Sequence, residues 1–436
     1  MAEITINVHR KLMTAQPVVY CIPDTKDSKR FISRCYNNDV NVIILIKRKW
    51  LATTDLTNCI AYILVDDFEN EKEAIKQATT AVIEAVYGLE TIDYFIAFAE
   101  MNLYLLNDIT THIKKDPAAS NIIRSFRDKR VMRQLASEHN VPNPLFKSAD
   151  ELSSPRAFDN FIVEVMNLAK EKQNPVGFVL KPCSDCGSAG VKVFSDPNAL
   201  YHSVLALDKP ELYLVEEKIS GRLLHVDTAI YNRKIIYQAI GAYDCSLLET
   251  EKYGHQNFMW HTLGTETALG MKLTEFNKTI LRVFNLNYGF THTEIFVEDN
   301  TNALYLCETA ARPPGLSLFD LHALASGKHA FDIFVDTMSG LHDANNELLD
   351  MYRTIGTVVF NPEIGILKEV TSLADIADEY TLSWEQTAQP GTLFDKNHYA
   401  TQVAQIICST QDESHCVSVL KNYAQQYKCA YEKMKE

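Results

Sequence analysis

The chain has 436 residues, enough for more than one packed unit, and its 46% hydrophobic and 22% charged residues are typical of a folded globular protein rather than a disordered or fibrous one. Its formal net charge of -14 repels a phosphate backbone over most of the surface, which argues against a general nucleic-acid-binding protein. The N-terminus lacks the continuous apolar segment of a secretory signal, and no run of about eighteen apolar residues follows. Ten cysteines without a repeated spacing fit reduced thiols. We therefore expect a cytoplasmic protein.

The N-terminal quarter of the chain alternates short apolar runs with helical patterns. Four runs have the length of buried strands, and they cover residues 18–22, 42–46, 61–65 and 94–98. Between the last two, apolar residues recur at helical spacing from Ala74 to Val86, which predicts a crossover helix. This alternation indicates a parallel α/β domain, which we expect over residues 1–115.

A second unit follows, over residues 116–345. Segment 128–139 has helical spacing and is ended by prolines at 142 and 144. Strand-like runs come next at residues 177–182, 212–216, 226–230 and 234–240, then a helix near 273–285 and a hairpin across 290–308. This mixture predicts an α+β region built around a sheet.

The last part of the chain predicts a closing α+β domain over residues 346–436. Its strand-like runs lie at 357–360, 366–370 and 403–408, and a final helix begins at about residue 413. No internal repeat or low-complexity tract interrupts the chain.

Glu294 and Glu308 carry the clearest chemical signal. Turn-forming residues at 299–302 lie between them, so the flanking segments should form an antiparallel hairpin. Counting from this turn places Glu294 opposite Cys307 or Glu308, and a β-bulge would decide between the two registers. Facing carboxylates repel each other unless a cation neutralises them, and Mg²⁺ prefers such oxygen ligands. The alternative is that the carboxylates lie on different faces and are simply solvated.

Arg312 strengthens the metal interpretation. It follows Glu308 by four residues, on a stretch stiffened by Pro313 and Pro314 and followed by Gly315. A planar guanidinium beside a metal suits a carboxylate or the oxyanion of a developing acyl phosphate.

A loop of small residues, 184–190, follows Lys181 between two strand patterns. The backbone N–H groups of Gly187, Ser188 and Gly190 can close over phosphate oxygens, with Lys181 as a point charge. The loop does not match the P-loop pattern, and an ordinary turn has the same composition.

Two neighbouring features also have simple alternatives. Cys183 and Cys186 form a CxxC with no second pair to complete a zinc site, so we interpret them as incidental thiols. Lys129 opens a helix after Asp128, where most lysines are solvated, although one near a nucleotide can reach a phosphate.

Residues 214–221, Leu-Val-Glu-Glu-Lys-Ile-Ser-Gly, are typical of a buried strand that breaks into a linker. A broken strand exposes N–H and C=O groups that can bind an adenine edge, with a Glu accepting from the exocyclic amine. By itself, this pattern is also that of a common strand end.

Taken in order, these motifs resemble the ATP-grasp superfamily. His-Thr-Glu at 292–294, followed by Glu-x-x-x-Arg-x-x-Gly at 308–315, is most similar to the L-amino-acid ligases that make dipeptides. The resemblance covers residues 90–345 and extends to the two ends only in outline.

The resemblance implies a fold, cofactors and residue roles. The fold would combine the N-terminal parallel α/β domain, a two-part nucleotide-binding region with a mobile lid subdomain around 145–220, and the C-terminal closing domain. The cofactors would be ATP and Mg²⁺, with Mn²⁺ as a substitute. Lys129 and Lys181 would bind phosphates under the 184–190 loop, and Glu216, Glu217 and Ile219 would lie along adenine. Glu294 and Glu308 would hold the metal. Arg312 and the Gly315 amide would stabilise the acyl phosphate.

Two residues depart from the family pattern. Leu223 stands where the family often has a Glu that contacts ribose, and Ala310 stands where it usually has an Asn that binds metal. The mode of ribose binding and the number of metal ions are therefore in doubt. His261, in the stretch that leads to the acceptor pocket of the dipeptide ligases, is a candidate substrate residue, with His255 a lesser one, although a lone His is more often structural.

We therefore expect an ATP-dependent carboxylate–amine ligase that forms an amide from an amino acid and an amine and releases ADP and phosphate. One alternative is an ATP-grasp carboxylase or nucleotide-pathway ligase, and another is a catalytically weak nucleotide-binding sensor. Leu223 and Ala310 favour the sensor slightly, whereas both glutamates, both lysines and Arg312 oppose it. The expected partners are ATP and small-molecule carboxylate and amine substrates, without nucleic acid or membrane, and we allow for a homodimer.

Overall fold

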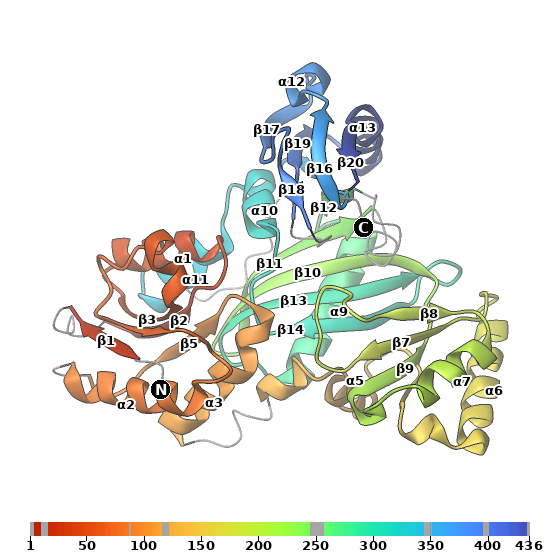
Figure 1. Ribbon diagram of the computed structural model, residues 1–436, viewed down its shortest axis with the longest axis horizontal. Coiled ribbons are helices and arrows are strands. Elements are labelled where there is room, and N and C mark those ends of the chain that lie inside the picture. Colours follow the sequence, from red (N-terminus) through yellow and green to blue (C-terminus); the bar gives the residue numbers. More distant parts are fainter. Residues whose placement is uncertain are drawn as a thin grey trace.

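The computed structural model describes residues 4–9, 16–86, 89–115, 122–244, 257–343, 349, 351–395 and 401–433. A large central sheet forms the middle of the molecule (Figure 1). An N-terminal unit lies at one end of this sheet, a small antiparallel unit lies at the other end, and the C-terminal elements stand above it.

The N-terminal unit is a five-stranded sheet with the order β1-β4-β3-β2-β5. Its strands are β1 (Thr5–Val8), β2 (Val18–Ile22), β3 (Asn41–Lys47), β4 (Ala61–Val65) and β5 (Tyr94–Ala97). The four strands predicted from apolar runs are parallel to one another. The crossover connections between parallel strands place helices over both faces of the sheet, which explains why these strands are continuous apolar runs. The edge strand β1, which was not predicted, is antiparallel to β4.

Three helices cover this sheet, and two 3₁₀ turns lie in the connections that follow its strands β3 and β5. They are α1 (Ser28–Asn37), α2 (Lys72–Ala85), α3 (Leu103–Lys114), η1 (Arg48–Thr53) and η2 (Glu100–Asn102). The predicted crossover helix is α2, which buries Ile75, Ala78 and Val82 against the sheet.

The small antiparallel unit follows α5 (Lys129–Glu138) and has the strand order β6-β9-β7-β8. Its strands are β6 (Phe146–Ser148), β7 (Phe178–Pro182), β8 (Lys192–Phe194) and β9 (Tyr213–Glu217). Its helical segments are η3 (Glu151–Ser153), α6 (Pro155–Glu171), α7 (Pro197–Leu205) and η4 (Pro210–Leu212). A core of its own, which includes Phe161, Phe178 and Leu200, makes residues 146–217 a separate packing unit, named the lid unit below.

The central sheet has eight antiparallel strands in the order β14-β13-β10-β11-β12-β15-β19-β17. They are β10 (Gly221–Tyr231), β11 (Lys234–Tyr243), β12 (Phe258–Leu263), β13 (Gly289–Glu298), β14 (Leu304–Ala310), β15 (Thr354–Phe360), β17 (Thr381–Gln386) and β19 (Ala404–Thr410). The sheet therefore continues across residue 345, since β12 pairs with β15.

Helices cover both faces of this sheet. On one face α9 (Ala268–Phe284) packs against β10 and β11, and α13 (Glu413–Gln426) packs against β12, β15 and β19. On the other face lie α10 (Leu318–Ser326) and α11 (Ala330–Met338). The face under α10 and α11 is named the site face below.

The C-terminal elements add a three-stranded sheet with the order β18-β16-β20. They comprise β16 (Gly365–Val370), α12 (Leu373–Ile376), β18 (Leu393–Phe394) and β20 (Cys429–Glu432). With α13 and β19, they share one core around Leu367, Leu420 and Tyr423.

The N-terminal unit and the central sheet share a core. Phe31 of α1 lies edge-on to Phe98, Phe290 and Phe331, with ring centroids 5.5, 6.2 and 5.8 Å away. This contact brings the ends of strands β2 and β5 close to the hairpin β13–β14, where the predicted site residues lie.

Candidate active site

Glu294 and Glu308 are cross-strand partners in the hairpin β13–β14. The register is the second of the two that the sequence allowed, and an irregularity between Glu294 and Ile295 produces it. Because partners directly opposite each other point to the same face, the two carboxylates lie together on the site face. The interpretation that they lie on different faces is wrong.

Lys129 provides the counter-charge for this pair. Its Nζ lies 3.0 Å from Glu308 Oε2 and donates to the carbonyl of Asp185 at 2.7 Å. Burial alone would raise the pKa of Glu308, but Lys129 and Lys181 outweigh burial and lower this pKa to about 2. Asp128 caps the helix that presents Lys129, because its side chain accepts from the backbone of residues 130 and 131.

Lys181 belongs to a second group of charges. Its Nζ lies 2.7 Å from Glu216 Oε2, and Arg133 Nε donates to Glu216 Oε1 at 2.8 Å. Arg133 also donates to the carbonyl of Cys307 at 2.6 Å. Burial raises the pKa of Glu216, but Arg133 and Lys181 lower it below its ordinary value. The side chain of Glu216 therefore positions Lys181. The same contacts join three parts of the structure, namely α5, the lid unit and β14.

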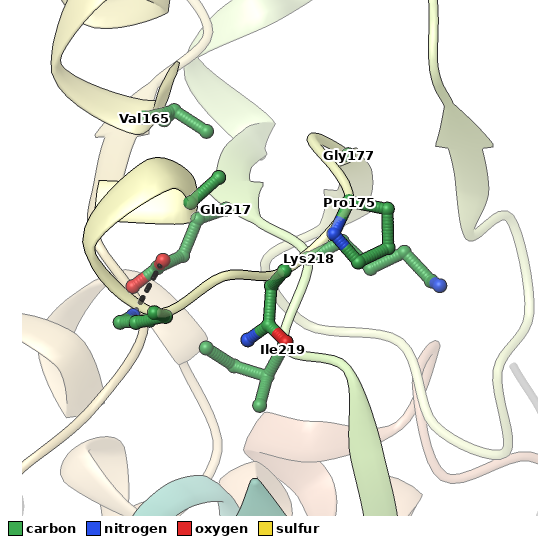
Figure 2. Close-up of a pocket in the computed structure, with 9 residues that line it drawn as sticks. Val165, Pro175, Gly177, Glu217, Lys218 and Ile219 are labelled. Carbon is green, nitrogen blue, oxygen red and sulfur yellow. Dashed lines mark hydrogen bonds and ion pairs between the residues drawn. The ribbon is translucent and has the colours of Figure 1, made fainter. Parts of the chain in front are cut away.

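Glu217 lies on the opposite face of the lid unit. Its Oε2 is 2.8 Å from Lys172 Nζ, and its Oε1 accepts from the backbone of Leu145 at 3.0 Å. Figure 2 shows this side chain in a small hollow that Val165, Pro175 and Gly177 also line. The amides of Glu217 and Lys218 are also occupied, since they donate to the carbonyls of Leu145 and Gly177, both at 2.9 Å. Of the segment that was expected along adenine, the Glu217 carboxylate and these two amides are therefore engaged elsewhere, and the buried Ile219 side chain remains.

The 184–190 loop lies over Lys129. The Lys129 amide donates to the Cys183 carbonyl at 2.8 Å, and Lys129 Nζ donates to the Asp185 carbonyl. Gly187, Ser188 and Gly190 all have positive φ, with values of 62°, 63° and 71°. Small residues suit these left-handed positions, although Ser188 adopts one at a steric cost.

The thiols of Cys186, within this loop, and of Cys183, just before it, are not activated. Burial raises the pKa of Cys183 to about 11 and raises that of Cys186 as well. Since the thiolate is the reactive form, neither residue has the low pKa of a redox cysteine.

Arg312 is held by a carboxylate that sequence analysis missed. Its Nε and Nη2 donate to Glu100 Oε2 at 3.2 and 2.9 Å, and Arg127 Nη1 donates to the other oxygen of Glu100 at 2.9 Å. Glu100 follows β5, where the ends of parallel strands commonly contribute to a ligand site. The turn after Gly315 is strained, since Leu316 and Ser317 both have a φ of 55°.

His261 is separated from this group. Its ring nitrogens lie 2.7 Å from Asp244 Oδ2 and 3.2 Å from Glu413 Oε1, so it packs between the sheet and α13. Neighbouring residues in a strand point to opposite faces, and Trp260 lies on the site face. The expected substrate role of His261 is therefore wrong, and His255 lies outside the described residues.

The site residues that were not predicted from the sequence were missed for a common reason. Arg133, Arg127 and Glu100 have no motif around them, and their partners lie 27 to 212 residues away in sequence. The only signal for Arg127 is its place two residues before Lys129.

Comparisons with known proteins support the fold. No family model matches the chain, and no curated protein matches it in sequence. Among solved structures, an L-amino acid ligase from Bacillus licheniformis superposes with a TM-score of 0.70 at 13% identity, over 97% of this chain and 100% of that one.

Two further structures give the same result. A carboxyaminoimidazole ribonucleotide synthase from Aspergillus clavatus, complexed with ATP, has a TM-score of 0.62 at 13% identity, over 94% of this chain and 99% of its own. A biotin carboxylase from Campylobacter jejuni has a TM-score of 0.62 at 14% identity, over 95% of this chain and 92% of its own. The expected fold class is confirmed.

Among the described helices, none has both the length and the apolar composition that crossing a membrane requires.

Proposed function

From the ATP-grasp fold that this chain shares with those ligases, we propose that the protein is an ATP-dependent carboxylate–amine ligase. It activates the carboxylate of an amino acid as an acyl phosphate and joins it to an amine, with release of ADP and phosphate. The observation that supports this most directly is the cross-strand pair Glu294–Glu308, with Lys129 and Lys181 as the cations that lower the pKa of Glu308.

The donor set fits a magnesium ion. Two buried or half-buried carboxylates on adjacent strands supply the oxygen ligands that Mg²⁺ and Mn²⁺ prefer. Glu308 already depends on Lys129 for neutralisation, which supports a need for positive charge between these strands. When bound, the ion would be held by Glu294 and Glu308 and would neutralise charge on the phosphates of ATP.

Each remaining residue has one task in this proposal. Lys129 and Lys181 hold phosphate oxygens, and Glu216 keeps Lys181 extended toward them. The amides of Gly187, Ser188 and Gly190 close over the phosphates, while the Ile219 side chain lies along adenine.

Arg312 and the Gly315 amide stabilise the charge that develops on the reacting carboxylate. Glu100 orients Arg312 through two hydrogen bonds, so that the planar guanidinium is fixed before the substrate arrives. A nucleotide sensor would have no use for an arginine that is held in this way, which favours the ligase over the sensor.

The experiment is an assay of ADP release across a panel of amino acids, supplied singly and in pairs, with bicarbonate as a separate arm. Stimulation by a pair, together with an amide product in mass spectrometry, is the expected result. Stimulation by bicarbonate would favour a carboxylase. A flat result over a broad panel of carboxylates and amines would lead us to abandon the ligase.

Two properties of the whole protein belong to the same proposal. The cysteines of the described residues are all free thiols, which fits the reducing cytoplasm. We also propose a homodimer, which light scattering of the purified chain would test.

A further inference from the structure

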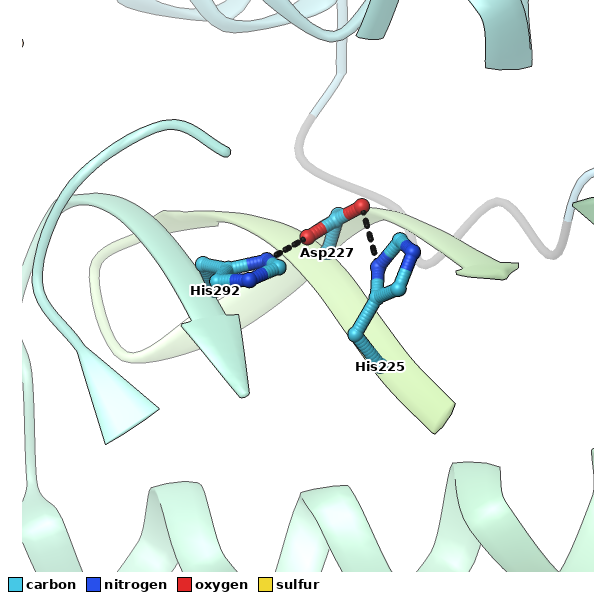
Figure 3. A group of neighbouring side chains, drawn as sticks. All are labelled: His225, Asp227 and His292. Carbon is cyan, nitrogen blue, oxygen red and sulfur yellow. Dashed lines mark hydrogen bonds and ion pairs between the residues drawn. The ribbon is translucent and has the colours of Figure 1, made fainter. Parts of the chain in front are cut away.

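A buried polar cluster lies beside Glu294 on the site face. It consists of Asp227 with His225, His292 and His322, and it is named the Asp227 cluster below. His225 and Asp227 lie on the same side of β10, and their cross-strand partners on β13 are Glu294 and His292. Figure 3 shows the Asp227 carboxylate between the rings of His225 and His292.

Asp227 is in close contact with three histidines and forms hydrogen bonds with two of them, His292 and His322. Its Oδ1 lies 2.6 Å from His292 Nδ1, and its Oδ2 lies 2.8 Å from His225 Nδ1 and 3.0 Å from His322 Nε2. All four side chains are nearly or fully buried. An uncompensated carboxylate would be costly at this depth, so these contacts are what allow Asp227 to stay ionised.

The same residue types could hold a metal ion, but the protons are in the wrong places. The indole Nε1 of Trp260 donates to His225 Nε2, and an indole can only donate. His225 Nε2 is therefore the unprotonated nitrogen, and Nδ1 carries the proton that faces Asp227. A metal ion would need the lone pair at Nδ1, so the cluster is held together by hydrogen bonds and ion-pair contacts and is not a metal site.

Gly241 makes this arrangement sterically feasible. It is the cross-strand partner of His225, and a Cβ at this position would collide with both Trp260 Nε1 and His225 Nε2. The absence of a side chain therefore lets the indole reach His225 and determine which of its nitrogens bears the proton.

His292 connects the cluster to the carboxylate pair. Because its Nδ1 is bound to Asp227, its Nε2 points away from Asp227 and lies 3.7 Å from Glu294 Oε1 and 3.3 Å from Tyr243 Oη. Its cross-strand partner on β14 is the small residue Ala310. The imidazole is therefore placed between Asp227 and Glu294.

We propose that Asp227 is a positioning residue that acts through His292 on Glu294. This inference rests on the proposed function, because it takes Glu294 as a metal ligand. Carboxylates that bind metal are oriented by outer polar partners, and His292 is such a partner at ion-pair distance from Glu294. Loss of an outer partner weakens metal affinity by about 10 to 100-fold. His322 extends the link to α10, which starts three residues after Gly315, so Asp227 couples the carboxylate pair to the Arg312 turn.

The experiment measures Mn²⁺ affinity by electron paramagnetic resonance, in the full chain saturated with a non-hydrolysable ATP analogue. Asp227→Asn and His292→Gln should each weaken Mn²⁺ binding by about 10-fold or more. His261→Asn is the matched control, because it removes a buried histidine with carboxylate partners from the opposite face. It should lower the melting temperature and leave Mn²⁺ affinity unchanged.

A double variant separates positioning from simple electrostatics. If Asp227 acts through His292, adding Asp227→Asn to His292→Gln should weaken Mn²⁺ binding no further. A fully additive loss, or single variants that match the His261→Asn control, would overturn the inference while leaving the ligase intact. If Asp227→Asn does not fold, His292→Gln against the same control still decides. Failure of the wild-type chain to bind Mn²⁺ with nucleotide would instead overturn the metal assignment itself, and this inference with it.

Discussion

Glu308 shows at the scale of one residue how the site depends on charge balance. Burial opposes its ionised form, and two lysines more than compensate. Such a carboxylate is poorly explained as a stabilising group, because replacing a buried ion pair with apolar residues is often neutral or favourable. Its charge is better explained by a cationic ligand.

We predict that Glu294→Ala and Glu308→Ala each abolish ATP turnover while circular dichroism remains that of the wild type. Each variant removes one of the two metal ligands and relieves the repulsion between them. Asp299→Ala is the matched control, since it removes an exposed carboxylate from the turn of the same hairpin and should retain full turnover. Near-normal turnover in either glutamate variant would remove the metal assignment.

Arg312→Lys should lower turnover by about 100-fold, which is the scale for losing one oxyanion donor. Lysine keeps the charge but cannot form the paired contact with Glu100 or the planar fork toward a carboxylate. ATP affinity, measured by calorimetry with a non-hydrolysable analogue, should barely change. An equal loss of ATP affinity and turnover would place Arg312 in nucleotide binding instead.

His261 makes folding stability depend on pH. Burial lowers its pKa, but Asp244 and Glu413 outweigh burial and raise it from 6.5 to about 9, a shift that corresponds to about 3 kcal/mol. Because the folded pKa is the higher one, this stabilisation is fully present below pH 6.5 and is lost as the pH rises through 9.

We therefore predict that His261→Asn destabilises the protein most at low pH. In urea unfolding, the difference in unfolding free energy between wild type and variant should shrink as the pH is raised from 6 to 9.5. A difference that stays constant over this range would show that the imidazole is not charged in the folded protein.

At the scale of elements, the 184–190 loop differs from the strands that flank it. Few of its side chains are apolar, and three of its residues adopt positive φ, so its own packing contributes little to holding it in place. The loop is held from outside by Lys129, which donates to the Asp185 carbonyl, and by Tyr104, whose Oη lies 3.4 Å from Ser184 Oγ.

We predict that ATP with Mg²⁺ protects this loop from limited proteolysis, because phosphate oxygens would hold its amides in place. Mass spectrometry would compare cleavage within residues 184–190 with and without ligand. The β15–β16 connection, residues 361–364, is the internal control and should be cut equally in both samples. Equal cleavage of the 184–190 loop would argue against its role as a lid.

At the scale of the whole molecule, the N-terminal unit cannot be separated from the central sheet. Phe31 is fully buried among aromatic rings from both parts, and Arg34 of α1 makes an ion pair with Asp336 of α11. The site lies where these parts meet, since Glu100 comes from one and Arg312 from the other.

Phe31→Ala should accordingly lower the free energy of unfolding by about 3 to 5 kcal/mol, the cost of removing a fully buried phenylalanine. Urea unfolding followed by circular dichroism and by tryptophan fluorescence should shift together, because the damaged core is common to both parts. Met101→Ala, at a side chain that is 70% exposed, is the control and should have little effect. A loss confined to one spectroscopic signal would mean that the N-terminal unit unfolds independently.

Local patterns in the sequence determined most of the elements and the central pair. Apolar runs predicted β2 to β5, turn residues predicted the β13–β14 hairpin, and the order of the motifs predicted the fold. These features are encoded by neighbours along the chain, where side-chain periodicity and turn chemistry act over a few residues.

Only the tertiary structure decided which polar side chains meet. It placed His261 under α13 and His292 beside Glu294, turned Glu217 toward α6, and brought Glu100, Arg133 and Asp227 to the site. The face on which a strand residue lies depends on the register of the whole sheet, and a shift of one residue reverses it. Contacts between distant segments depend on how complete sheets and helices pack, and no local pattern contains that information.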